Sequence, residues 1–245
     1  MDESLKKTEP IGNGLEIFVS KNHTFGTDAV LLSYFASAKQ KDKLVDLGTG
    51  CGIIPFLMLR DKKLLSAVGV DISDEAVYLA EKSAKLCNFD NFKGVCSDLK
   101  DLKGKVDFGC NTLVTCNPPY KADGAGLKNP NARKKVARHE VECNLEDIVS
   151  VSAKLLQTSG RLCMCHRPER LAELMSLMRQ YKTEPKRMRL VSQRKGLSPW
   201  LVLVEGKRCA NTGLVIEPTL YIENGNGGFS DEMINIYGAY KEAYL

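Results

Sequence analysis

Four residues, Asn117-Pro118-Pro119-Tyr120, have the chemistry needed to methylate a planar, poorly nucleophilic amino nitrogen. Such a nitrogen delocalises its lone pair into a conjugated system, so it attacks a methyl donor only when the lone pair is drawn back. The Asn117 side-chain oxygen and the Pro118 carbonyl can accept its two N–H bonds, and Tyr120 can stack on the substrate. The prolines fix φ and lack an N–H, which stiffens the turn. Alone, the tetrapeptide fits equally well a Pro-Pro turn that caps a strand.

A glycine-rich loop, Asp46-Leu47-Gly48-Thr49-Gly50-Cys51-Gly52, lies upstream of the tetrapeptide. The glycines Gly48, Gly50 and Gly52 let the backbone approach a ligand closely and turn into a helix. Dinucleotide sites favour the spacing G-x-G-x-x-G, whereas this loop reads D-x-G-x-G-x-G. Its leading Asp46 would repel a phosphate but suits the amino group of a methionine moiety. The loop therefore predicts a site for S-adenosylmethionine, a sulfonium methyl donor.

Two further carboxylates follow the next two expected strands. Asp71 ends a strand about 20 to 25 residues after the loop, where a carboxylate can accept hydrogen bonds from both ribose hydroxyls. Asp98 follows the third strand and is placed to contact the adenine amino group. Each acid alone is also typical of a helix cap or a turn. The order of the loop, the two acids and the tetrapeptide favours a cofactor site.

The elements that must position these residues alternate along the chain. We expect strands at residues 43–46, 67–71, 92–96, 111–116 and 161–166, and helices at 53–60, 74–87, 145–157 and 170–181. Ser73 is the expected N-cap of the second helix. Two short β-like runs, 187–192 and 200–205, predict an antiparallel closing hairpin. The pattern predicts an α/β, Rossmann-like fold: a doubly wound, mostly parallel sheet with ligands at the carboxyl ends of its strands.

The 245 residues are enough for one large α/β core, and no linker-like stretch divides them. We expect a single domain over residues 1–245, with an N-terminal segment at 1–42 and the core and a C-terminal extension at 43–245. Neither a signal peptide nor a transmembrane stretch is evident, so a cytoplasmic location is expected. The nine cysteines lack paired C-x-x-C spacing and are interpreted as reduced thiols, several of them in the core. Cys163-x-Cys165-His166 has no second ligand pair nearby, so no metal is expected.

Three further segments carry a resemblance: Phe25-Gly26-Thr27-Asp28-Ala29-Val30-Leu31-Leu32, residues 129–140, and His166-Arg167-Pro168-Glu169-Arg170-Leu171. With the motifs above, the chain resembles the class I S-adenosylmethionine-dependent methyltransferases. In particular, residues 11–240 resemble the bacterial tRNA1(Val) (adenine-37-N6)-methyltransferases. The resemblance implies that Thr27 and Asp28 lie near the methionine end of the cofactor, although Asp28 also fits a helix N-cap. Asn117 is expected to border the cofactor as well as the target nitrogen. Thr219, where a second proline is expected beside Pro218, departs from the family pattern in a local turn.

Basic residues indicate an RNA partner, because they gather beside the tetrapeptide although the formal net charge is only +5. The expected RNA-binding residues are Lys121, Lys128, Arg133, Lys134, Lys135 and Arg138. A second cluster comprises Lys182, Lys186, Arg187, Arg189, Arg194 and Lys195. Phosphate contacts are the natural use of such clusters, although any single lysine fits a solvated surface equally well. The expected partner is tRNA, whose loop bases can be turned out into a pocket.

Three classes of function fit these features. The first is N6-methylation of an adenine in tRNA, which the resemblance places at position 37 of the anticodon loop of tRNA1(Val). The second is methylation of another conjugated nitrogen: a guanine N2 in ribosomal RNA, or a protein glutamine amide. Only about 45 residues precede the glycine loop, fewer than the helical domain that glutamine methyltransferases of release factors usually carry. The third is a non-catalytic RNA-binding module, against which Asn117 and Tyr120 argue. A monomer is expected.

Overall fold

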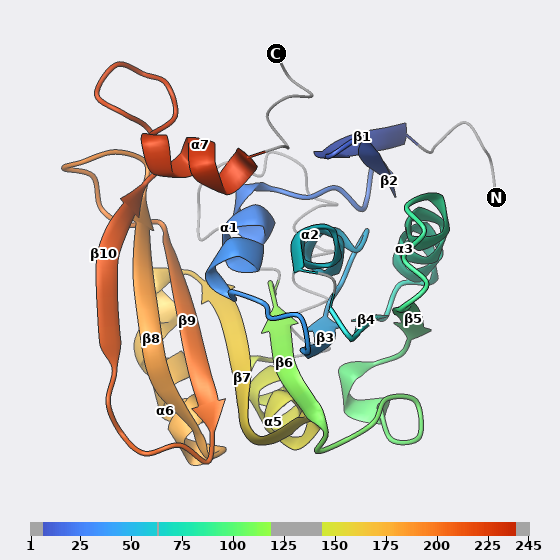
Figure 1. Cartoon of the computed structure of the whole chain (residues 1–245). Coiled ribbons are helices and arrows are strands. Elements are labelled where there is room, and N and C mark those ends of the chain that lie inside the picture. The colour runs from blue at the N-terminus through green and yellow to red at the C-terminus, as the bar shows by residue number, and fades with distance from the viewer. Residues whose placement is uncertain (1–6, 63, 119–143, 239–245) are drawn as a thin grey trace, which may run out of the picture.

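The computed structural model describes residues 7–62, 64–118 and 144–238 (Figure 1). The strands are β1 Lys7–Gly12, β2 Leu15–Val19, β3 Lys43–Leu47, β4 Ser66–Asp71, β5 Phe92–Cys96, β6 Asn111–Cys116, β7 Leu156–His166, β8 Thr183–Ser192, β9 Leu201–Arg208 and β10 Val215–Tyr221. The α-helices are α1 Thr27–Phe35, α2 Ile53–Lys62, α3 Asp74–Leu86, α5 Leu145–Leu155, α6 Leu171–Gln180 and α7 Asp231–Tyr237, and short 3₁₀ turns lie at Leu99–Asp101 and Pro168–Arg170.

Eight strands form the central sheet in the order β10-β8-β9-β7-β6-β3-β4-β5. The run from β7 to β5 is parallel throughout. β9 pairs antiparallel with both β7 and β8, so the expected closing hairpin is present with its second strand next to β7. The prediction of a doubly wound, mostly parallel sheet is therefore confirmed.

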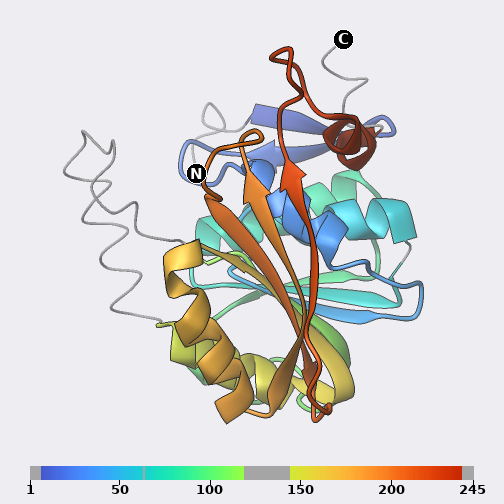
Figure 2. The ribbon, with the colours of Figure 1, turned by 90° about the vertical axis from the view of Figure 1, so that its left-hand side faces the viewer.

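Helices cover both faces of the sheet, as Figure 2 shows from the side. One buried cluster joins the sheet to α1 and α2, with Leu32 and Phe56 fully buried in it. A second cluster joins the opposite face to α5 and α6, through residues such as Val149 and Leu174. Successive residues of a strand point to opposite faces, so Leu44 belongs to the first cluster and Val45 to the second. Because helices cover both faces of the sheet, successive residues of the central strands are buried on either side, which explains their nearly continuous apolar runs.

The structure differs from the sequence-based expectation at several elements. β10 was not expected; it pairs in parallel with β8 and forms the edge of the sheet. Its residues Val215 and Ile216 are 61% and 65% exposed. Pro218 has no backbone N–H to donate to a neighbouring strand, which is tolerated at the edge of a sheet. The β1–β2 hairpin and α7 were likewise not expected. β7 begins at Leu156, earlier than predicted, and thereby ends α5 at Leu155.

Candidate active site

The predicted site residues follow neighbouring strand ends. β3 pairs in parallel with β4 and β6, and β4 pairs in parallel with β5, so these four strands end at the same edge of the sheet. The glycine loop follows β3, Asp71 ends β4, Asp98 follows β5, and Asn117 follows β6. Ligands of open α/β sheets bind at this carboxyl edge. The topology therefore gathers the glycine loop, Asp71, Asp98 and Asn117 at one edge of the sheet.

The glycine loop requires its glycines for two different reasons. Gly48 and Gly50 have φ of +72° and +54°, and a Cβ on either would meet no atom within 4 Å. Their conformation is left-handed, which favours glycine, and they border open space. Gly52 has φ of +85°, and a Cβ there would collide with the Phe56 ring. Gly48 and Gly50 thus face a space that a ligand can enter, whereas Gly52 is needed for packing against α2.

Asp46 is fully buried at the base of this loop. Its Oδ1 accepts a hydrogen bond from the Thr115 hydroxyl at 2.6 Å. Among the described residues, its Oδ2 and the Thr49 Oγ1 have no hydrogen-bond partner. Burial raises the pKa of Asp46 to about 7, and the charge of Asp71 adds to this rise. The Thr115 hydroxyl opposes the rise through its hydrogen bond. The Thr49 hydroxyl also opposes it, although its position does not meet hydrogen-bond geometry. Two buried polar atoms without hydrogen-bond partners at the base of the loop are candidates for contact with a ligand that carries donors.

Asp71 ties the loop to the start of α3. Its Oδ2 accepts from the Gly50 backbone N–H and its Oδ1 from the Ser73 backbone N–H, both at 2.9 Å. Ser73 is the N-cap of α3, as predicted, because its hydroxyl accepts from the Ala76 N–H. Each carboxylate oxygen of Asp71 has a second lone pair. The carboxylate can therefore accept from a ribose hydroxyl while it holds the loop.

Asp98 combines a cap with an exposed carboxylate. It is the N-cap of the 3₁₀ turn Leu99–Asp101, and its Oδ1 accepts from the Lys100 N–H at 2.8 Å. Its side chain is 37% exposed. The cap interpretation is thus correct for Asp98, and its other oxygen, Oδ2, lies 4.0 Å from the Lys100 Nζ.

Asn117 and Pro118 come directly after β6, with Pro118 buried and Asn117 partly buried. The Asn117 Oδ1 accepts a hydrogen bond from the Cys165 thiol, with the sulfur at 3.0 Å. Cys165 was predicted only as a core thiol, because nothing in the sequence indicates which strand pairs with β6. Several predicted residues lie outside the described part of the chain: Pro119, Tyr120, Lys121, Lys128, Arg133, Lys134, Lys135 and Arg138.

Thr27 and Asp28 begin α1. The N-cap is Gly26, in extended conformation, so the interpretation of Asp28 as N-cap is wrong: the helix begins at Thr27, two residues earlier than that interpretation requires, and Asp28 lies in its first turn. The Thr27 hydroxyl lies 3.1 Å from the Tyr237 hydroxyl of α7. Just upstream, the His23 Nε2 lies 3.0 Å from the Ser73 hydroxyl. The N-terminal segment is therefore held beside the turn that follows Asp71.

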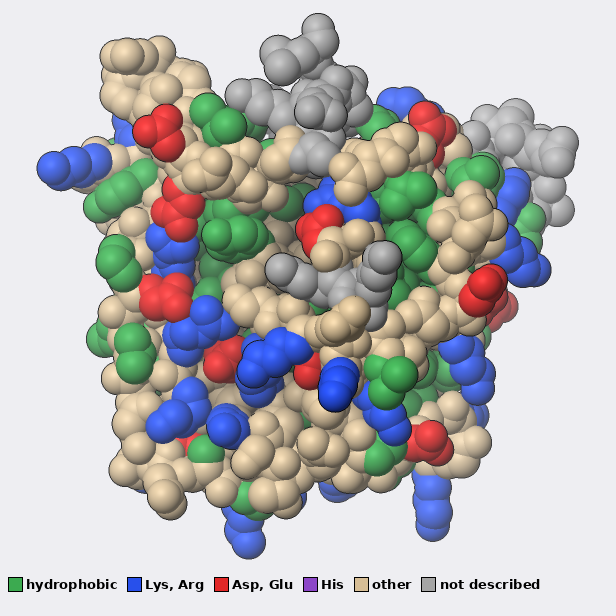
Figure 3. All heavy atoms as spheres, in the orientation of Figure 1, with side chains coloured by type: hydrophobic (Ala, Val, Ile, Leu, Met, Phe, Trp, Pro, Cys, Tyr) green, Lys and Arg blue, Asp and Glu red, His purple; other side chains and the backbone are tan. Residues whose placement is uncertain are grey.

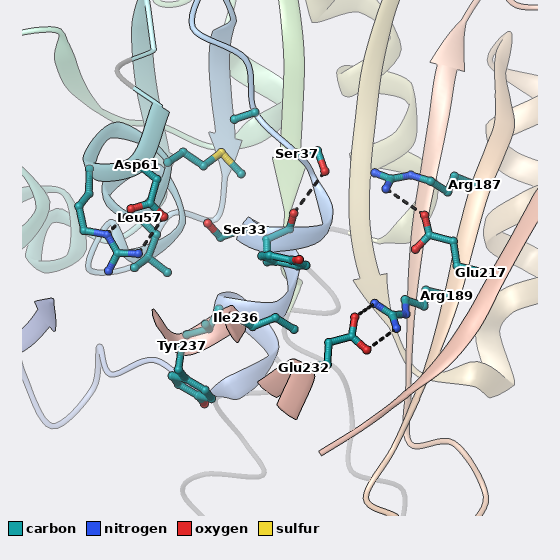
Figure 4. A pocket seen from close by; sticks show the side chains of 15 residues that line it. Ser33, Ser37, Leu57, Asp61, Arg187, Arg189, Glu217, Glu232, Ile236 and Tyr237 are labelled. Carbon is teal, nitrogen blue, oxygen red and sulfur yellow. Dashed lines mark hydrogen bonds and ion pairs between the residues drawn. The ribbon is translucent and has the colours of Figure 1, made fainter. Parts of the chain in front are cut away.

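A cavity of about 540 Å³ lies between α1, α2, α7 and the edge strands (Figure 4). Its charged side chains are paired: Arg187 with Glu217 at 3.0 Å, and Arg189 with Glu232 at 2.6 and 2.7 Å. It is lined by none of the predicted cofactor residues. We therefore interpret it as the seam that anchors α7 to the sheet.

These ion pairs separate the second basic cluster into side chains that are paired within the protein and side chains that are exposed. Arg187 and Arg189 bind carboxylates, and Lys186 donates to the Asn211 and Thr212 carbonyls. In Figure 3, basic and acidic side chains are mixed across the lower half of this face. Arg194 and Lys195 differ because they are exposed in the turn after β8. β8 and β7 both run antiparallel to β9, so this turn lies at the same edge as Asn117.

Within residues 7–62, 64–118 and 144–238, no three His, Cys, Asp or Glu side chains are grouped so as to hold a metal ion. In the same ranges, no helix has both the length and the apolar character needed to cross a membrane.

The sheet order and the ligand-binding edge define a Rossmann-like class I methyltransferase fold. The chain belongs to the methyltransferase small domain family, whose sequence model matches residues 12–186. Among solved structures, a predicted O-methyltransferase from Agrobacterium tumefaciens has a TM-score of 0.69 at 18% identity, covering 87% of this chain and 96% of that chain. TYW2 from M. jannaschii in complex with AdoMet has a TM-score of 0.58 at 10% identity, covering 84% and 87%. At these identities the likeness concerns the fold.

Two similar sequences are both named tRNA1(Val) (adenine(37)-N6)-methyltransferase. The protein from Parabacteroides distasonis is 29% identical over 181 residues, which cover 74% of this chain and 75% of the relative. The protein from Porphyromonas gingivalis is 27% identical over 224 residues, which cover 86% of each chain. The similarity thus extends well beyond the glycine loop.

Proposed function

We propose that this protein transfers a methyl group from S-adenosylmethionine to N6 of an adenine in tRNA, at position 37 of the anticodon loop of tRNA1(Val). The observation that carries the proposal is the position of Asn117 and Pro118, which follow β6 at the edge where the glycine loop, Asp71 and Asp98 also lie. The names of the relatives over most of this chain's length support the substrate. The cytoplasm, where tRNA is processed, is the proposed location.

The residues at this edge fit the proposed cofactor. Gly48 and Gly50 border open space, and the buried Asp46 Oδ2 lacks a partner among the described residues, which suits the ammonium group of a methionine moiety. Asp71 would accept from the ribose hydroxyls, and Asp98 from the adenine amino group. Thr27 and Asp28 would border the methionine end. When bound, S-adenosylmethionine supplies an electrophilic methyl group on a sulfonium centre.

The chain's own contribution to the reaction is to prepare the target nitrogen. Asn117 Oδ1 and the Pro118 carbonyl oxygen would each accept one N–H of the adenine amino group, which draws the lone pair back onto N6. The lone pair then forms the new N–C bond as the S–C bond of the methyl group breaks. The methylated nitrogen is cationic and acidic, so it loses its proton to water without a protein base. Binding in a fixed orientation supplies the remainder of the rate enhancement.

The proposed roles of Tyr120 and of the basic residues from Lys121 to Arg138 rest on the sequence alone. Tyr120 would stack on the adenine, and Lys121, Lys128, Arg133, Lys134, Lys135 and Arg138 would contact phosphates of the RNA. Their placement beside Asn117 in the chain supports this assignment.

The experiment that tests the substrate uses labelled S-adenosylmethionine and total tRNA from cells that lack the modification. Mass spectrometry of the nucleosides identifies the product. N6-methyladenosine in tRNA1(Val) is the expected result. N2-methylguanosine, obtained when ribosomal RNA is supplied instead, would replace the proposal with the guanine alternative. Label found in protein alone would replace it with the glutamine alternative.

The variant Asn117→Ala tests the proposed role of this residue. Loss of one acceptor at the reacting nitrogen is expected to lower kcat by about 100-fold or more. The affinity for S-adenosylhomocysteine, measured by calorimetry, is expected to change by less than about twofold, because Asp71 and the glycine loop are intact. An equal loss of kcat and of cofactor affinity would contradict the assignment.

A further inference from the structure

The thiol of Cys165 makes a direct contact with the proposed catalytic side chain. Cys165 is 0% exposed in β7, and its Sγ donates to the Asn117 Oδ1 at a distance of 3.0 Å. A thiol is a weak donor, but this sulfur is buried and the bond is partly shielded from solvent, which strengthens a hydrogen bond relative to one in water. The acceptor is the same oxygen that the proposed function assigns to the target amine.

The register of two neighbouring strands creates the contact. β6 and β7 are parallel, with Cys116 opposite Met164. The next residues, Asn117 and Cys165, are therefore adjacent where the strands end. Cys165 belongs to the buried cluster beneath α1 and α2, whereas Met164 belongs to the cluster on the opposite face. The sulfur is thus held by packing on the side from which it reaches Asn117.

We propose that Cys165 is a positioning residue that holds the Asn117 amide in its productive orientation; this inference rests on the proposed function of Asn117. An amide oxygen has two lone pairs. One accepts the Cys165 S–H, and the proposed function assigns the other to an N–H of the adenine amino group. Rotation of the amide by 180° would exchange this oxygen for the NH₂ group, which would present donors to the amine. The thiol bond disfavours that rotation and keeps an acceptor at the reacting nitrogen.

Cys163 provides a matched control on the same strand. It is also 0% exposed, and it points to the same face because the two cysteines are two residues apart. Its Sγ lies 3.6 Å from the Glu205 Oε2, and burial raises the pKa of its thiol above the ordinary value. Removing either sulfur leaves a similar cavity in the same cluster. Of the two thiols, Cys165 donates to Asn117, whereas Cys163 donates to Glu205.

The test compares Cys165→Ala, Cys165→Val and Cys165→Ser with Cys163→Ala in steady-state kinetics on undermodified tRNA. Cys165→Ala and Cys165→Val lack the donor and are expected to lower kcat about tenfold, with the KM for S-adenosylmethionine changed by less than about twofold. Cys165→Ser keeps a donor and is expected to recover kcat to within about threefold of the parent. Cys163→Ala is expected to keep the parental kcat. The valine variant fills the space of the sulfur, so it remains informative if the alanine variant unfolds.

A double-mutant cycle separates the two proposals. In the Asn117→Ala background, Cys165→Val should cause no further loss of kcat, because the thiol acts through Asn117. An undiminished tenfold loss in that background, or equal losses for Cys165→Ala and Cys163→Ala, would overturn the positioning role while leaving the proposed function intact. Full activity of Asn117→Ala itself would instead overturn the proposed function.

Discussion

The pH dependence of stability offers a sharp test of the buried carboxyl at the base of the glycine loop. Asp46 is fully buried, and burial raises its pKa from the ordinary 3.8 to about 7. A carboxyl whose pKa is raised by folding binds its proton more tightly in the folded chain than in the unfolded chain. The folded state is therefore favoured at low pH, and this contribution is lost as the pH rises through the folded pKa. The substitution Asp46→Asn removes the titration but keeps an oxygen that can accept from Thr115.

The two pKa values determine the size of the effect. With 1.36 kcal/mol for each pH unit, the full difference between 3.8 and about 7 corresponds to about 4 kcal/mol. The change begins near pH 4 and levels off above pH 7. Between pH 5 and pH 8, the free energy of unfolding of the parent should fall by about 2.5 kcal/mol relative to Asp46→Asn. The amide of Asp46→Asn can also change the free energy of unfolding by an amount that does not depend on pH, and such a change leaves the predicted fall between pH 5 and pH 8 unaltered.

The assay is urea unfolding of both chains without cofactor, at half-unit steps from pH 5 to pH 8. The difference between the two free energies at each pH cancels the other titrating groups, which the chains share. A difference that stays flat across the range would exclude the raised pKa, because Asp46 would then be ionised in the folded protein at every pH tested. A folded-state pKa at or below the ordinary value gives the same flat result, because the carboxyl is then ionised in both states over this pH range.

Two further predictions concern the ligands. Asp71→Ala removes the acceptor of the Gly50 and Ser73 N–H groups and of the proposed ribose hydroxyls. Calorimetry should therefore show an affinity for S-adenosylhomocysteine about 100-fold lower. Unchanged affinity would exclude Asp71 as the ribose acceptor. Arg194→Gln/Lys195→Gln should weaken tRNA binding and reduce the slope of log affinity against log salt by about 1.5. The charge-matched control is Lys182→Gln/Lys186→Gln, whose residues lie just before β8 and in its first half, roughly 20 Å or more from the turn. If the two double variants weaken tRNA binding equally, the turn that contains Arg194 and Lys195 has no special role in binding tRNA.

The sequence was sufficient wherever a local pattern carried the information. The apolar runs and glycine turns predicted β3, β4 and β6, which position Asp46, Asp71 and Asn117, because a parallel strand buried on both faces has a distinctive composition. The cap at Ser73 followed from its position before an amphipathic helix, and the structure confirms it. The placement of the site at the carboxyl edge then follows from parallel pairing alone.

Some elements were missed although a signal was present. The β1–β2 hairpin turns at Asn13 and Gly14, whose φ angles are +56° and +70°, and Asn-Gly is the preferred pair for such a turn. β10 has no comparable signal, because its exposed Val215 and Ile216 and its Pro218 do not alternate between a buried and an exposed face. Its place beside β8 depends on contacts that a local pattern does not contain.

The contacts that connect the site join residues far apart in the chain. Cys165 lies 48 residues from Asn117, and Tyr237 lies 210 residues from Thr27. In the sequence, Cys165 is an apolar residue in an apolar strand, and its burial was predicted correctly. Its bond to Asn117 depends on which strand lies next to β6 and in which register. A core residue and a residue proposed to orient the reaction thus have the same local pattern. The register of β7 against β6 places Cys165 beside Asn117 and Cys163 beside Thr115.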